Sequence, residues 1–170
     1  HSMSNHGHYA WTELLRCHGE VMHNSLRGIV FDCGPSSLGR SSPESRAEAT
    51  VGTAFGALLA HGITLDRQQR LAIRSAAARV EWPWQTDAIF EWQAKAEPPV
   101  PTLCICADDD DLMRFDDTQH FANVLRTSAR QVFVTLLHGN HVRLLDTDAD
   151  RFGESVTQLL LVAGLAPQGN

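Results

Sequence analysis

Hydrophobic positions along the chain form two kinds of pattern. Short continuous runs rich in β-branched and aromatic residues are typical of buried strands, and they occur over 26–32, 102–106 and 131–137. Apolar residues at helical spacing predict helices over 9–22, 43–61, 66–80, 86–97, 116–126 and 148–163. Strands that alternate with helices pair in parallel, so the pattern predicts an α/β fold with a mostly parallel sheet and flanking helices.

Helix start signals support the middle of this pattern. Ser42, Pro43 and Glu44 supply an N-cap, a first-turn proline and a first-turn acid, and residues 66–69 (DRQQ) form a capping-box pattern. Three consecutive helices therefore separate two strands. We expect residues 40–97 to form a helical cap inserted into a single domain that covers residues 1–170.

Composition limits the class of protein. The 170 residues are 43% hydrophobic and 20% charged, which is typical of one globular domain, and no apolar run approaches the length of a membrane-spanning helix. The net charge of -6 argues against nucleic acid as a partner, because phosphate binding needs a basic surface. The sequence begins HSM without a signal-peptide pattern, which favours an intracellular protein.

Cysteines, histidines and clustered acids suggest metal sites, but their spacing fits poorly. The cysteines at 17, 33, 104 and 106 are too scattered for a disulfide framework, so we expect reduced thiols. Histidines stand at 6, 8, 18 and 23, but His18 and His23 do not share a helix face cleanly and no spaced acid follows His8. The acids at 108–111 lack the alternation and glycine of a calcium loop. We therefore expect no metal and no cofactor, with a histidine metal site as the weakest alternative.

Candidate catalytic residues follow the strands. Ligands of open α/β sheets lie beyond the carboxyl ends of the strands. Ser4 precedes the first helix, residues 108–111 follow the strand 102–106, and residues 138–141 follow the strand 131–137. The order serine, acid, histidine is that of the α/β-hydrolase triad.

Each residue type has a chemical role in such a triad. The Ser4 hydroxyl needs an imidazole to take its proton, and the imidazole needs a carboxylate to orient it. The amide of the next residue, Asn5, would face the developing oxyanion at the helix amino end. His6 stands where a small residue is usual in this turn. A helix N-cap is the alternative role for Ser4.

A family resemblance is carried by four segments, namely 1–7 (HSMSNHG), 27–35 (RGIVFDCGP), 103–112 (LCICADDDDL) and 140–142 (NHV). In them the sequence resembles the transmembrane-protein-53-like family, eukaryotic proteins of α/β-hydrolase fold and poorly defined function. The family's turn typically reads His-x-Phe-Ser-Asn-Gly-Gly, which aligns Ser4 and Asn5 with its serine and asparagine. Met3 and His6 replace Phe and the first Gly.

By this alignment the resemblance implies Asp110 as the acid and His141 as the base. Asp109 and His138 remain the alternatives, and any member of 108–111 is open as the acid. The resemblance covers the carboxyl-terminal part of such a fold, and we expect an N-terminally incomplete copy.

Two functions remain open from the sequence. The first is a serine hydrolase that acts on an ester or similar small acyl substrate. The second is a non-catalytic protein of the same fold, whose cap binds a membrane surface or a protein partner; the resemblance implies membrane or nuclear-envelope association. The tryptophans at 82, 84 and 92 would pack within the cap, line an acyl pocket or touch a membrane. The substrate and the oligomeric state stay open.

Overall fold

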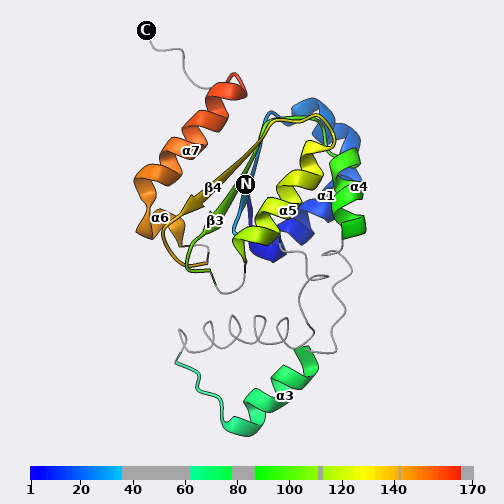
Figure 1. Cartoon of the computed structure of the whole chain (residues 1–170). Helices are drawn as coiled ribbons and strands as arrows, with labels where there is room; N and C mark the ends of the chain where they lie inside the picture. Colours follow the sequence, from blue (N-terminus) through cyan, green and yellow to red (C-terminus); the bar gives the residue numbers. More distant parts are fainter. Residues whose placement is uncertain (36–61, 78–86, 111–112, 142, 166–170) are drawn as a thin grey trace.

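One parallel sheet organises the molecule. The computed structural model describes residues 1–35, 62–77, 87–110, 113–141 and 143–165. Within these ranges the strands β1 (Ser2–Met3), β2 (Ile29–Asp32), β3 (Thr102–Ala107) and β4 (Val132–Leu137) pair in that order, all parallel (Figure 1). Parallel pairing brings the carboxyl ends of all four strands to one edge of the sheet.

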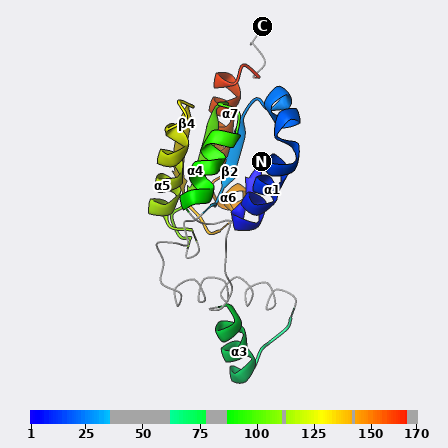
Figure 2. The same cartoon turned by 90° about the vertical axis from the view of Figure 1, so that its right-hand side faces the viewer.

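Helices cover both faces of this sheet. The helices α1 (Ser4–Ser25), α4 (Asp87–Ala96) and α5 (Phe115–Arg126) lie on one face, and α6 (Leu144–Thr147) and α7 (Ala149–Val162) on the other (Figures 1 and 2). The helix α3 (Arg67–Ala77) lies apart from the sheet in both views. The α/β class and the parallel sheet predicted from the sequence are confirmed.

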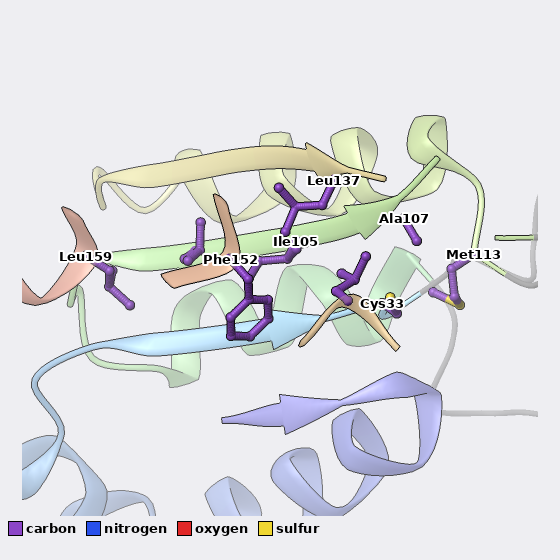
Figure 3. Packing of buried hydrophobic residues seen from close by; sticks show 9 residues of the cluster. Cys33, Ile105, Ala107, Met113, Leu137, Phe152 and Leu159 are labelled. Atoms are coloured by element: carbon purple, nitrogen blue, oxygen red, sulfur yellow. The ribbon is translucent and has the colours of Figure 1, made fainter. Parts of the chain in front are cut away.

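The central strand β3 explains why the sequence there is apolar without interruption. Successive side chains of a strand point to opposite faces. Leu103 and Ile105 pack with Phe152 and Leu159 of α7 (Figure 3), whereas Cys104 packs with residues of α4 and α5 on the other face. Every residue of β3 is buried because both faces are covered.

A buried cluster of polar side chains joins α1, α4 and the turn before β4. His8 bonds through Nε2 to Gln93 Oε1, and Trp11, Gln93 and Arg130 all donate hydrogen bonds to Glu97. Arg130 also donates to the Ala94 carbonyl oxygen at 3.0 Å. The charges of Glu97 and Arg130 are fully buried, so each is satisfied by its partner rather than by water.

Most predicted elements are present within the described residues, with shifted ends. The helix expected over 9–22 begins earlier, at Ser4, and the capping box is confirmed by reciprocal bonds between Asp66 and Gln69 of 3.0 and 2.8 Å. The short α6 was not predicted, because four residues carry no period. The helix expected over 43–61, most of the cap, and the tryptophans at 82 and 84 lie outside the described residues. Among the described helices, none combines the length and the apolar character needed to cross a bilayer.

Candidate active site

Ser4 lies where a strand passes directly into a helix. It is the first residue of α1 and follows Met3, the last residue of β1, without an intervening loop. Met3 pairs with Asp32 of β2, so this turn sits at the carboxyl edge of the sheet. The backbone therefore turns directly from strand to helix at Ser4 and Asn5, which is the local structure expected around the nucleophile of an α/β-hydrolase. The expected contact between the Ser4 hydroxyl and a histidine lies outside the described side chains.

Gly7 supplies the close approach that this turn needs. A Cβ at Gly7 would lie 3.1 Å from Ser2 Oγ and 3.2 Å from the Ser2 carbonyl carbon. The first turn of α1 therefore packs directly against β1. This tight contact falls three residues after Ser4, one position beyond His6.

Asp110 and His141 form a hydrogen-bonded pair beyond the ends of β3 and β4. His141 Nδ1 lies 2.8 Å from Asp110 Oδ2, and Asp110 Oδ1 accepts a 2.9 Å bond from the Met113 backbone N–H. The Asp110 side chain is fully buried, whereas that of His141 is 19% exposed. A buried, doubly bonded carboxylate fixes the imidazole, while the partial exposure leaves the ring accessible.

A second histidine–acid pair lies beside the first, but it is open to solvent. His138 Nδ1 lies 3.1 Å from Asp108 Oδ2, and the His138 side chain is 78% exposed. The hydrogen bond to Asp108 raises the pKa of His138, and the Gly139 N–H, together with His138, lowers the pKa of Asp108. This pair holds the loop after β4, because Asp108 Oδ1 also accepts the Gly139 N–H at 3.0 Å.

Of the acids and histidines that the sequence left open, the structure brings Asp110 to His141 and Asp108 to His138. Asp109 N–H bonds instead to the Gly139 carbonyl oxygen at 3.1 Å, and Asp111 lies outside the described residues. The catalytic roles assigned to Ser4, Asn5, Asp110 and His141 remain predictions.

Cys33 stands next to the Asp110–His141 pair. Its Sγ, a carboxylate oxygen of Asp110 and a ring nitrogen of His141 all lie within 4.8 Å of one another. The thiol is buried, in the cluster that contains Ala107 and Met113 (Figure 3). Cys33 follows β2 with φ of +49°, a left-handed conformation that costs a non-glycine residue about 1 kcal/mol. Its N–H bond to the Ile105 carbonyl oxygen, 2.9 Å, helps to hold this conformation.

Asp32 adds a second buried carboxylate at the same edge. His1 Nε2 lies 3.2 Å from Asp32 Oδ2, whereas Asp32 Oδ1 is buried without a hydrogen-bond partner among the described residues. Burial raises the pKa of Asp32, while a hydrogen bond with the Cys33 side chain and the charge of His141 lower it and the charge of Asp110 adds to the rise.

Reasoning from the sequence missed Asp32 and Cys33 as site residues. The signal was present, because both stand at the end of the strand predicted over 26–32, between the strands that carry Ser4 and Asp110. Cys33 was interpreted as a reduced thiol and lies in the segment 27–35 that carries the family resemblance, but it was given no role in the site.

Comparison with known proteins bears on the fold. No family model matches the sequence, and no curated protein matches it. The structure is similar to an esterase from Pyrococcus furiosus at 15% identity and a TM-score of 0.58, over 94% of this chain and 51% of the esterase. An esterase from a Rhodococcus species is similar at 19% identity and a TM-score of 0.56, over 97% of this chain and 64% of that one.

The chain has an α/β-hydrolase fold. An acylaminoacyl peptidase from Pyrococcus horikoshii is also similar, at 16% identity and a TM-score of 0.51, over 99% of this chain and 24% of the peptidase. The chain spans about half the length of the Pyrococcus furiosus esterase. At these identities the similarity supports the α/β-hydrolase fold, and a shared fold does not by itself assign an activity.

Proposed function

We propose that this α/β-hydrolase domain is a serine hydrolase acting on an ester or a related acyl substrate, with Ser4, Asp110 and His141 as its triad. The observation that carries the proposal is the buried Asp110 carboxylate bonded to His141 Nδ1 at 2.8 Å, at the sheet edge where β1 passes into α1 at Ser4. A bonded acid and imidazole on adjacent strands are the parts that activate a serine.

The chemistry follows from the orientation of the imidazole. Because Nδ1 faces Asp110, Nε2 of His141 is the nitrogen that accepts the Ser4 proton as Oγ attacks the acyl carbon. The Asn5 amide, in the first turn of α1, would donate to the oxyanion. His141 then protonates the departing alcohol. Water attacks the acyl-serine and gives a proton to His141, which passes it to Ser4 Oγ as the bond from Oγ to the acyl carbon breaks and the carboxylic acid leaves.

The comparisons support the same kind of reaction. Two similar structures are esterases, and a third is an acylaminoacyl peptidase. Attack of a nucleophile on an acyl carbon is common to both activities. The resemblance to the transmembrane-protein-53-like family supports the same triad residues, and we keep family membership as part of this proposal.

Hydrolysis of p-nitrophenyl butyrate by matched variants of the full chain tests the proposal. We expect Ser4→Ala, Asp110→Asn and His141→Gln each to lower kcat/KM by about a thousandfold or more. The neighbouring pair supplies controls, because Asp108→Asn and His138→Gln change charges of the same kind in the same loops. These controls should stay within about threefold of the wild-type rate. Thermal melting confirms that each variant is folded.

Two results would count against the triad. One is a loss of rate in the Asp108 and His138 variants with Asp110→Asn and His141→Gln unaffected. The other is a folded wild-type chain that hydrolyses no ester, which would favour the non-catalytic alternative. That alternative would bind a membrane surface or a protein partner through the cap expected over residues 40–97.

A further inference from the structure

The Asp110–His141 pair has a third neighbour that triad chemistry does not use. Cys33 places a thiol among the same donor atoms, so one thiol, one imidazole and one carboxylate lie within 4.8 Å of one another. These residues come from the ends of the three adjacent strands β2, β3 and β4. Position on neighbouring strand ends, rather than proximity in sequence, assembles the cluster.

This donor set matches the preference of zinc. Zinc binds thiolate sulfur, imidazole nitrogen and carboxylate oxygen at about 2.0–2.3 Å, and open sites combine three protein donors with water. Donors on such a tetrahedron are about 3.5 Å apart, so the three side chains would need to close by about 1 Å. Hard cations such as magnesium and calcium prefer oxygen donors and do not suit a thiol.

The surroundings also favour a cation. Asp32, adjacent to Cys33 in sequence, is buried, interacts with the Cys33 side chain by a hydrogen bond, and acts electrostatically on Asp110 and His141; its Oδ1 has no hydrogen-bond partner among the described residues. Two carboxylates therefore share the environment of one imidazole. His141 is the partly exposed member of the cluster and gives the ion a route to it.

We infer that Cys33, Asp110 and His141 bind a zinc ion, or another thiophilic divalent metal, in competition with the Asp110–His141 hydrogen bond. The ion takes the place of the proton between carboxylate and imidazole, and that proton moves through solvent to Nε2 of His141, while the Cys33 thiol releases its proton to solvent on binding. Metal binding needs no active serine. Its consequence, reversible inhibition by zinc because His141 is no longer free to act as a base, rests on the proposed function.

Titration of the full chain with cobalt(II) tests the metal site by absorption. We expect one ion per chain, with a thiolate-to-cobalt band in the near ultraviolet and the visible bands of tetrahedral cobalt. Cys33→Ser should remove the thiolate band and weaken binding by at least about tenfold. Cys17→Ser, at an exposed thiol, and His138→Gln, in the neighbouring pair, should leave both bands unchanged.

Three results would overturn the inference: no cobalt binding by the folded chain, a thiolate band that survives Cys33→Ser, or its loss in Cys17→Ser. Zinc-edge X-ray absorption of the wild-type chain tests the site without a variant. It should show one sulfur at about 2.3 Å with nitrogen and oxygen donors at about 2.0–2.2 Å, and a shell without sulfur would refute the site.

Ser4→Ala separates this inference from the proposed function. This variant should bind cobalt as the wild type does, whether or not the chain hydrolyses esters. If hydrolysis is observed, zinc should inhibit Cys17→Ser at least tenfold more strongly than Cys33→Ser, each compared with its own rate without metal. Equal inhibition would mean that zinc acts elsewhere.

Discussion

His8 shows how burial decides what a single residue does. In the sequence it belongs to a histidine cluster that suggests metal binding, yet its ring contacts Phe31, Phe90 and Phe121 at centroid distances of 5.6–6.0 Å. Nε2 bonds to Gln93, and Nδ1 is buried without a partner among the described residues. Desolvation lowers the pKa of His8 to about 4, against the bond to Gln93, which raises it.

We therefore expect His8 to titrate at about pH 4 and to make stability depend on pH. The unfolded chain takes up this proton near pH 6.5 and the folded chain near 4, so stability falls as pH drops from about 6.5 to about 4. The loss from this group is about 3 kcal/mol, and it levels off at lower pH. An NMR titration of the histidine ring signals measures the pKa of His8. His138 is the control and should titrate above 6.5, while His8 titrating near 6.5 would contradict the account.

Residues of the candidate site also show where inference from one sequence ends. The two later strand ends could be located from the hydrophobic runs alone, because parallel strands finish at one edge. The two residues of β1 form no such run, and Ser4 was singled out by its place before the first helix and by the family resemblance. The hydrophobic runs could not show that Asp110, rather than Asp109, bonds to His141, because this depends on which carboxylate the turn after β3 directs toward the histidine. The sequence places Cys33 at the end of a predicted strand, but residues that touch across a sheet leave no local pattern, so its proximity to Asp110 and His141 could not be predicted.

Among the elements, the loop from β4 to α6 is the most constrained part of the site. Thr147 Oγ1 donates to the His138 carbonyl oxygen at 2.8 Å, and the His138 N–H donates to Asp148 Oδ2 at 3.0 Å. Gly139 sits inside this loop at φ of +145°, where a Cβ would lie 2.1 Å from Thr147 Oγ1. The loop therefore needs glycine at 139 for two reasons: its positive φ disfavours a side chain, and a Cβ would clash with Thr147. His141, two residues further on, depends on it for its position.

Replacing this glycine should be costly. We expect Gly139→Ala to lower the free energy of unfolding by about 2–3 kcal/mol, because the methyl group must displace Thr147 and the backbone disfavours a side chain. The matched control is Gly153→Ala within α7, where a Cβ meets nothing within 4 Å. That change should stabilise the chain by about 0.5–1 kcal/mol. Urea unfolding of both variants decides, and equal effects would contradict the loop's role.

Considered as a whole, the molecule is an α/β-hydrolase sheet whose fold was predictable and whose site was predictable only in part. The strands β2, β3 and β4 were predictable from their apolar runs, of which that of β3 is uninterrupted because both of its faces are covered, whereas the two-residue β1 was not predicted. The helices were predictable from the helical spacing of their apolar residues, although α6 is too short to show such spacing. Convergence of the strand ends follows from parallel pairing. Contacts among the side chains at those ends depend on register and turn geometry, which the sequence pattern does not encode.

Labelling by a fluorophosphonate probe tests the central claim, that these strand ends assemble an activated serine. The probe reacts with a serine hydroxyl only when a base takes its proton, so it requires the assembled site rather than the fold. We expect the full chain to be labelled at Ser4, as located by peptide mass spectrometry, and the label to be lost in His141→Gln but kept in His138→Gln. A folded chain without label, or a label on another serine, would contradict the account.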